Sequence, residues 1–276
     1  MVNRKLLIRW LSIAVYFIAA FLVFLLLLFP FDRVLNKLES EVRQRTELEL
    51  SIARVSPRFF NRFVLTDVVV SDKTGRVLFE SPSVNTTVSL FGLLRGLVNM
   101  DLKARAYGGE LLVKTQQGRG KQYLMLDANN LDIGAYTMLK QSGVNLSGRL
   151  GGNVEITGDT GKGRLWMKGL TSRELKIKGF SIPDLDFEQC WIEADLKGDR
   201  LTIKKLDLDG KELKIRCSGD MVVRERGSLN LIVKLKASER LAQQQAALLS
   251  LLKNKDADGF YQFSLGGTLA EPMPRL

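Results

Sequence analysis

Residues Leu6 to Phe29 form a nearly unbroken apolar run, in which Ser12 and Tyr16 are the most polar side chains apart from Arg9 near its start. At about 1.5 Å per residue, a helix of this length crosses a hydrocarbon core of roughly 30 Å. A cleaved signal peptide is the alternative, but its apolar region usually spans about 7 to 15 residues and ends in a small-residue cleavage site. The run ends instead in Phe29-Pro30-Phe31-Asp32, so we expect one uncleaved membrane anchor. Its anchoring side chains include Leu6, Trp10, Phe17, Phe21, Phe24 and Phe29.

The charges that flank the run predict its orientation. Arg4, Lys5 and Arg9 crowd the amino-terminal side, whereas Asp32 and Arg33 balance each other on the far side. The positive-inside rule therefore places the N-terminus in the cytoplasm and the chain after Pro30 across the membrane.

The net charge of +11 selects no partner by itself. Lys and Arg alternate with apolar residues along most predicted strands, as on any solvated sheet face. Because the topology puts most of this charge beyond a membrane, acidic lipid head groups are the expected counterpart, and we expect no nucleic-acid binding.

The periodicity divides the chain into an anchor (1–30), a juxtamembrane amphipathic helix with a lead-in segment (31–62) and a β-rich domain (63–276). Val34, Leu35, Leu38 and Val42 have helical spacing between Asp32 and about Leu50. From Phe63 onward, apolar residues alternate with polar ones. Glycine-containing turns separate the strands at Gly108-Gly109, Gly118 to Gly120, Gly151-Gly152, Gly158 to Gly163, Gly198 and Gly210.

This pattern predicts a mainly β fold with one long antiparallel sheet that curves on itself into a groove or an incomplete barrel. A second amphipathic helix is expected at 238–253, where Ser238 can cap the first turn and Leu241 begins an apolar face. A final strand is expected from Phe260 to Leu269. The sheet therefore has an amphipathic helix near each end.

Alternation also predicts which side chains line the apolar face in the second half of the sheet. If the groove stays open, this face can hold acyl chains; if it closes, the same residues are a core. The predicted lining residues are Cys190, Ile192, Ala194, Leu196, Leu201, Ile203, Leu213, Ile215, Leu229, Leu231, Val233 and Leu235.

The two cysteines, Cys190 and Cys217, are expected to remain free thiols. Turns at Gly198-Asp199 and Asp209-Gly210 place one strand between them, with a bulge at Lys204-Lys205. This register pairs Cys190 with Leu208 and Cys217 with Leu201, too far apart for a disulfide, which needs Cα atoms within about 7 Å.

The chain lacks the residues of common catalytic sites. It has no histidine, which excludes Ser-His-Asp and Cys-His pairs and HExxH zinc sites. Gly158-Asp-Thr-Gly-Lys-Gly163 lacks the Gly-Lys-Ser/Thr spacing of a phosphate loop, and Asp207-x-Asp209-Gly210 lacks the remaining ligands of a calcium loop. We interpret both as turns, and expect no enzymatic activity, cofactor or metal site.

Three short motifs follow the anchor in order: Leu90-Phe-Gly-Leu-Leu-Arg-Gly96, Tyr107-Gly-Gly-Glu-Leu111 and Phe263-x-Leu-x-Gly-Gly-Thr-Leu-x-x-Pro272. With the anchor, they resemble the type II secretion system protein N family (general secretion pathway protein N). The last two also resemble the AsmA-like group of periplasmic proteins.

The resemblance implies a single-pass protein of the bacterial inner membrane with a periplasmic β-rich domain and no catalytic residues. Its implied partners are inner-membrane lipid and type II secretion components, including the secretin. The first functional hypothesis is a non-enzymatic component of protein export across the cell envelope. The alternative is an AsmA-like protein that binds lipid or transfers it between the inner and outer membranes.

Overall fold

The computed structural model describes residues 39–275, except for positions 41, 45, 60, 90, 93–94, 119, 142–143, 174–175, 178–179, 182, 225–226, 251, 253–254 and 269–270. The predicted anchor, with Leu6, Trp10, Phe17, Phe21, Phe24 and Phe29, lies outside these residues, as does most of the predicted juxtamembrane helix. Among the helices of the described residues, none has the length and apolar character needed to span a bilayer.

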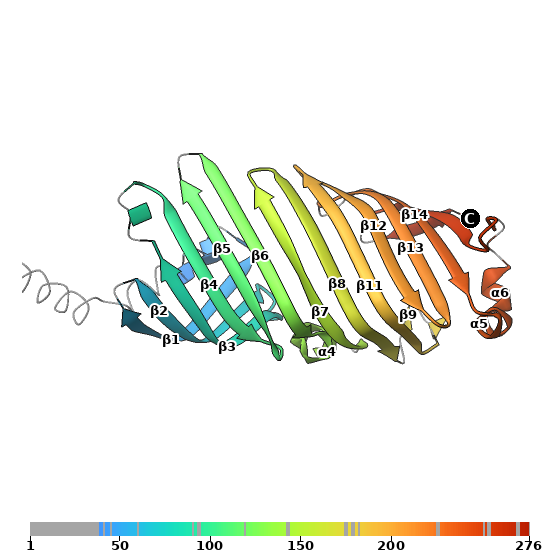
Figure 1. Cartoon of the computed structure of the whole chain (residues 1–276), viewed down its shortest axis with the longest axis horizontal. Helices are drawn as coiled ribbons and strands as arrows, with labels where there is room; N and C mark the ends of the chain where they lie inside the picture. Colours follow the sequence, from blue (N-terminus) through green and yellow to red (C-terminus); the bar gives the residue numbers. More distant parts are fainter. Residues whose placement is uncertain are drawn as a thin grey trace, which may run out of the picture.

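The chain folds into one curved, unclosed antiparallel sheet of 14 strands (Figure 1). Its first half contains β1 (Leu48–Phe59), β2 (Arg62–Asp72), β3 (Val77–Val88), β4 (Val98–Ala106), β5 (Gly109–Gly118), β6 (Lys121–Asp132) and β7 (Asn145–Thr157). Its second half contains β8 (Thr160–Arg173), β11 (Leu185–Lys197), β12 (Arg200–Gly210), β13 (Leu213–Val222), β14 (Leu229–Ala237), β15 (Tyr261–Gly267) and β16 (Pro272–Arg275). The predicted long antiparallel sheet is therefore confirmed.

Each strand of the sheet pairs with the next one along the chain, so the sheet is a continuous meander. The one detour is a separate two-stranded hairpin, β9 (Lys176–Ile177) and β10 (Phe180–Ser181), which is inserted between β8 and β11. In Figure 1 the first and last strands pass behind the middle ones, which shows the curvature of the sheet.

Short turns set the register of the hairpins, as at the connection from β4 to β5. Ala106 pairs with Gly109, and the two residues between them, Tyr107 and Gly108, have φ values of 50° and 71°. Positive φ at both central positions is the type I′ turn, whose twist matches that of the strands.

The sheet begins earlier in the sequence than predicted. Residues 39–40 and 42–44 are helical, but β1 occupies Leu48–Phe59, so the helix does not extend to Leu50 and most of the lead-in segment is strand. Leu48, Leu50 and Ile52 alternate with polar or small residues, and pairing with Asp72, Val70 and Val68 of β2 favours the strand. The boundary at residue 62 was therefore placed too late.

The C-terminal helix is shorter than predicted and consists of two pieces, α5 (Glu239–Gln244) and α6 (Ala246–Leu249). The predicted cap is present, because the Ser238 hydroxyl accepts a hydrogen bond from the Leu241 amide at 3.2 Å. The expected final strand is confirmed as β15, and an additional strand, β16, follows it.

Glycine positions predicted several turns correctly and one wrongly. The hairpins after Ala106, Gly118, Thr157 and Lys197 form as expected. A hairpin also follows Gly210, but Asp209 and Gly210 belong to β12, and Lys211 and Glu212 form its turn. Gly151 and Gly152 instead lie inside β7, paired with Trp166 and Leu165 of β8. These two large side chains occupy the space that the glycines leave, which is a reason for glycine within a strand.

Both cysteines are free, as predicted. Cys190 pairs with Leu208 and the bulge at Lys204 is present, but Cys217 pairs with Leu206 and not with Leu201. The reason is the position of the turn, because Gly210 ends β12 and Leu213 begins β13, so that Lys211 and Glu212 form the turn that was expected at Asp209-Gly210. The cysteines nevertheless stay on opposite sides of β12, about 9 to 10 Å apart across two strand spacings.

Candidate functional site

The backbone register places the apolar side chains of successive strands directly opposite one another on one face of the sheet. The first row across the sheet is Val84, Ala104, Leu111, Ala128, Gly152, Leu165, Ile192, Leu206, Cys217, Val233 and Phe263. The second is Thr86, Leu102, Val113, Leu126, Val154, Gly163, Ala194, Ile203, Gly219, Leu231 and Leu265. The third is Val88, Met100, Thr115, Leu124, Ile156, Gly161, Leu196, Leu201, Met221 and Leu229.

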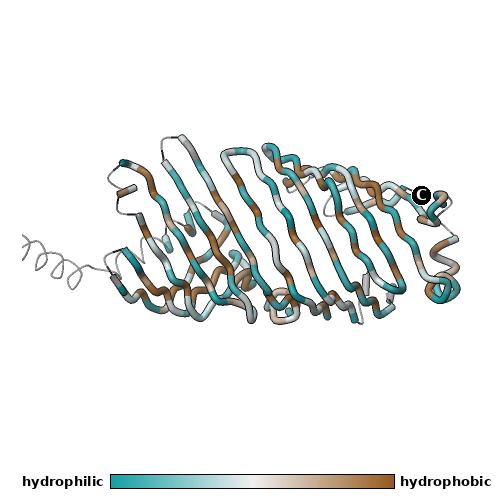
Figure 2. The backbone as a smooth tube through the Cα atoms, in the orientation of Figure 1, coloured by the Kyte–Doolittle hydropathy of each residue, from teal (hydrophilic) through white to brown (hydrophobic). Residues whose placement is uncertain are grey.

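We call the surface made by these three rows the apolar floor. Every residue in it is uncharged, and it runs from β3 to β15, which is on the order of 50 Å at the spacing of neighbouring strands. Figure 2 shows the alternation of hydrophobic and hydrophilic residues along each strand that produces it.

All twelve side chains that the sequence predicted as lining residues share this face. Ile192, Ala194, Leu196, Leu201, Ile203, Leu229, Leu231 and Val233 lie in the floor, and Cys190, Ile215 and Leu235 form a flanking row with Leu208. Leu213 is paired with Ala237 at the end of β13. Sequence reasoning missed the lining residues in β4 to β8, although the alternation of Leu124, Leu126 and Ala128 carries the same signal.

Burial differs along the floor. A core cluster of Leu185, Phe187 and Cys190 packs with Leu241 of α5 at the C-terminal flank. A second cluster, of Ile203, Leu229 and Leu231, lies in β12 to β14, and a third, of Val68, Val84 and Ala104, lies at the N-terminal flank.

No such cluster of buried residues is centred on β5 to β8 in the described part of the chain. Val113, Leu126, Val154, Ile156 and Leu165 are half-buried there. Side chains beneath a second packed layer would be buried, so the described residues form no such layer over this middle part of the floor. Adjacent apolar side chains that stay partly exposed on several strands are typical of a surface that contacts a hydrophobic ligand or partner.

The outer face of the sheet is polar and carries ion pairs across neighbouring strands. Lys204 pairs with Asp195 at 2.6 Å, and Lys103 pairs with Glu110 at 2.9 Å. Such exposed pairs contribute little to stability, so this face is best explained as a solvated surface.

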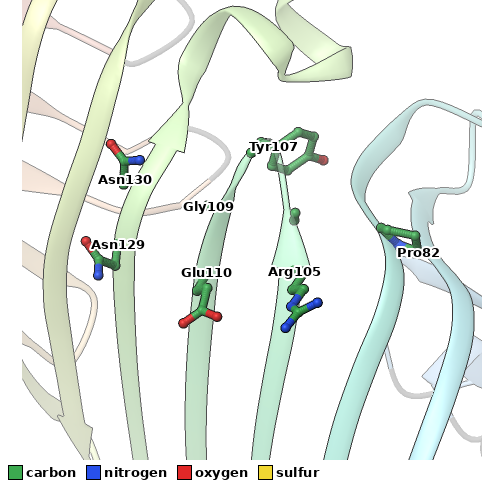
Figure 3. A pocket seen from close by; sticks show the side chains of 9 residues that line it. Pro82, Arg105, Tyr107, Gly109, Glu110, Asn129 and Asn130 are labelled. Carbon is green, nitrogen blue, oxygen red and sulfur yellow. The ribbon is translucent and has the colours of Figure 1, made fainter.

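A depression of about 560 Å³ lies on this outer face at the tip of the β4–β5 hairpin (Figure 3). Arg105, Glu110 and Asn129 project from neighbouring strands, with Tyr107 at the tip of the hairpin. The Tyr107 hydroxyl accepts a hydrogen bond from the Glu80 amide at 3.0 Å, and burial raises the pKa of this phenol. The phenol therefore stays protonated in neutral solution, and no nucleophile with an adjacent base lines the depression.

A short helical segment lies between β6 and β7, at the ends of the strands in the N-terminal half. It consists of η1 (Ile133–Ala135) and α4 (Thr137–Gln141), and the Thr137 hydroxyl donates to the Glu80 carboxylate at 2.6 Å. The Tyr107 ring packs edge-to-face against Phe79 and Tyr136, at centroid distances of 6.2 Å and 5.5 Å. These contacts join β3 to the segment between β6 and β7, which fixes the curvature of this half.

The two thiols differ in their surroundings. Burial raises the pKa of Cys190 to about 11 and also raises the pKa of Cys217. Both thiols are therefore protonated at neutral pH, where they act as small apolar side chains and not as nucleophiles.

Comparisons with protein-family models, with curated proteins and with solved structures returned no match. The candidate site is therefore defined by its geometry alone, which is a long uncharged floor on one face of a curved sheet. Its side chains supply apolar contact surface and no acid, base or nucleophile, so its chemistry is that of noncovalent binding.

Proposed function

We propose that this protein binds the acyl chains of lipids along its apolar floor and moves lipid between the membranes of the cell envelope. One observation supports the proposal most directly. Three uncharged rows continue from β3 to β15, and the described residues form no second layer over their middle part, which includes Leu126 and Val154. An acyl chain on this surface removes apolar area from water without leaving any charge unpaired.

The polar outer face suits this function. Because polar or charged residues alternate with floor residues along most strands, one side of the sheet can be solvated while the other side holds hydrocarbon. The anchor predicted at residues 6–29 would hold one end of the sheet at the inner membrane, in the proposed single-pass topology.

Photo-crosslinking in cells tests the proposal. A photoreactive residue at Ile192, in the floor, is expected to yield lipid adducts that mass spectrometry detects. The matched control is Ile232, which has 43% of its surface exposed and lies on the outer face of β14. Absence of lipid from Ile192 adducts, or equal labelling at Ile232, contradicts binding along the floor.

A charge barrier tests transfer separately from binding. Val154→Glu places a carboxylate in the middle row of the floor, whereas Asn153→Glu places the same group on the outer face of the same strand. Only Val154→Glu is expected to stop lipid movement in a donor-to-acceptor vesicle assay. If both variants transfer lipid at the same rate, the floor is not the route.

We propose a second function, as a non-enzymatic component of a type II secretion system. The observation that favours it is the position of the resembling motifs, which lie in the β3–β4 connection, at the β4–β5 turn and from β15 to the start of β16. In addition, β1 is the first strand of an unclosed sheet and can accept a strand from another β-domain. Deletion should impair the export of type II substrates or secretin assembly; normal export and assembly would contradict this function.

A further inference from the structure

Two neighbouring connections, at the same end of the first strands of the sheet, have features that the apolar floor does not explain. The turn between β1 and β2 and the connection between β3 and β4 are joined by a hydrogen bond from the Val88 amide to the Asn61 carbonyl at 2.9 Å. They lie side by side at the end of the sheet where the chain begins (Figure 1). We call this surface the N-terminal rim and define it by Arg58, Arg62, Phe91, Arg95 and Val98.

The rim exposes large apolar side chains on an ordered backbone. Phe91 has 62% and Val98 has 41% of its surface exposed. Hydrogen bonds from the Arg95 and Leu97 amides to the Gly92 carbonyl, both 2.9 Å, fold the connection that presents Phe91. An aromatic ring that is exposed to water is a feature of surfaces that insert into a membrane interface.

Positive charge surrounds these apolar side chains. The Arg95 guanidinium lies 4.1 Å from the centroid of the Phe91 ring. Arg58 and Arg62 are exposed and line a hollow of about 530 Å³ with Lys103 and Asp101. Among the described residues, neither Arg58 nor Arg62 forms an ion pair, so no described carboxylate within ion-pair distance neutralises their charges.

The described residues that precede β1 run toward the rim. The Thr46 hydroxyl accepts from the Leu48 amide, and the Glu39 carboxylate accepts from the Ile52 amide at 3.1 Å. Followed backward from Leu48 to Glu39, the described chain therefore runs along β1 toward Phe59, which is the end of the strand that carries the rim. The segment upstream contains the predicted anchor.

We propose that the N-terminal rim is a membrane-contacting surface that binds the head-group region of an anionic bilayer. Phe91 and Val98 enter the interface, and Arg58, Arg62 and Arg95 contact the lipid phosphates. This second attachment, beside the anchor, orients the N-terminal end of the sheet at the bilayer. The inference concerns a surface outside the apolar floor and does not require that the floor carries lipid.

The experiment uses the full chain reconstituted in phosphatidylcholine vesicles with or without phosphatidylglycerol. A polarity-sensitive fluorophore is attached at Val98→Cys, in a Cys190→Ala/Cys217→Ala background. The control position is Thr74→Cys in the β2–β3 turn, at the opposite end of the same strands. We expect blue-shifted emission and quenching by nitroxide-labelled lipid at position 98 when phosphatidylglycerol is present, and neither effect at position 74.

Charge and aromatic variants separate the contributions to the contact. With Arg58→Gln/Arg62→Gln, the ratio of bilayer-bound to free rim is expected to fall about 30-fold, because each basic residue near an anionic surface contributes about one kilocalorie per mole. Phe91→Ser is expected to reduce the quenching without changing its dependence on phosphatidylglycerol. Circular dichroism confirms that each variant keeps its β-sheet content.

The outcomes are decisive for the rim and independent of the floor. A fluorophore at position 98 that stays in water, or equal quenching at positions 74 and 98, overturns the inference. Quenching at position 98 that depends neither on phosphatidylglycerol nor on the arginine substitutions also overturns it, because the anchor alone then explains why this position lies near the bilayer. Lipid adducts at Ile192 measured with the arginine variant test the floor separately.

Discussion

The middle of the apolar floor and its C-terminal flank have the same alternating pattern but differ in what covers them. At the flank, Phe187 and Cys190 are buried in a cluster that includes Leu241 of α5. In the middle, Leu126 and Val154 are half-buried and belong to no such cluster among the described residues. At these two places, the same apolar alternation therefore gives a buried cluster where Leu241 of α5 packs against it and half-buried side chains in the middle strands.

The largest expected effect tests the covered flank. Phe187 is 6% exposed, and Phe187→Ala leaves a cavity in the cluster, so we expect it to lower the free energy of unfolding by about 3 to 5 kcal/mol. In the middle of the floor, Leu126→Ala is expected to cost only about 1 kcal/mol, because its side chain is already partly in water. Denaturant unfolding of the two variants measures both values. Equal losses would show that the middle is covered as well.

A smaller effect tests the packing of the middle strands on their outer face. A Cβ atom at Gly151 would overlap the ring of Trp166 on the neighbouring strand, so Gly151→Ala is expected to destabilise the fold by about 1 to 3 kcal/mol.

The control is the same substitution in a Trp166→Ala background. There the cost should fall below about 0.5 kcal/mol, because the overlapping ring is gone. A double-mutant cycle by thermal unfolding isolates this coupling. An unchanged cost in the two backgrounds would show that another contact requires the glycine.

The sequence predicted the sheet and most of its hairpins because alternation and turn chemistry are local signals. The type I′ turn at Tyr107-Gly108 and the cap at Ser238 are both of this kind. The floor residues of β11 to β14 followed from alternation alone, since a strand with one apolar face has a single way to orient it.

Features that depend on distant residues could not be predicted in the same way. Gly151-Gly152 is typical of a turn, and only the Trp166 and Leu165 side chains of β8 explain glycine inside β7. The partner of Cys217 depends on the position of the β12–β13 turn, which lies at Lys211-Glu212 although Asp209-Gly210 is the more typical turn sequence. Whether α5 covers the floor depends on tertiary packing, which the pattern does not encode.

A substitution at the cap of α5 can loosen the helix that packs over Phe187 and Cys190 without changing any residue of the floor. The Ser238 hydroxyl accepts from the Leu241 amide, so Ser238→Ala is expected to lower stability by about 1 kcal/mol. Loss of the cap should also loosen Leu241 over Phe187 and Cys190, and so raise the hydrogen-exchange rate of α5. Asparagine at position 238 is the control, because it can also cap and should restore most of the stability.

The two cysteines provide the finest measure of cover, because they lie on the same face but differ in exposure. Cys190 is 2% exposed, whereas Cys217 is half-buried in the floor. With the pKa of Cys190 at about 11, only about one thiol in a thousand is ionised at pH 8, so we expect Cys217 to be alkylated first.

The same thiols predict a direction for stability against pH. A raised pKa in the folded state means that the unfolded chain releases its thiol protons first, so stability is complete below about pH 9 and decreases as the pH rises toward 11. Cys190→Ala should weaken this alkaline loss, as measured by chemical unfolding at several pH values.

Added phospholipid should slow alkylation of Cys217 and leave the alkylation rate of Cys190 unchanged, because only the uncovered part of the face has room for an acyl chain. If lipid protects both thiols or neither, the distinction between covered flank and open floor is wrong at these two positions.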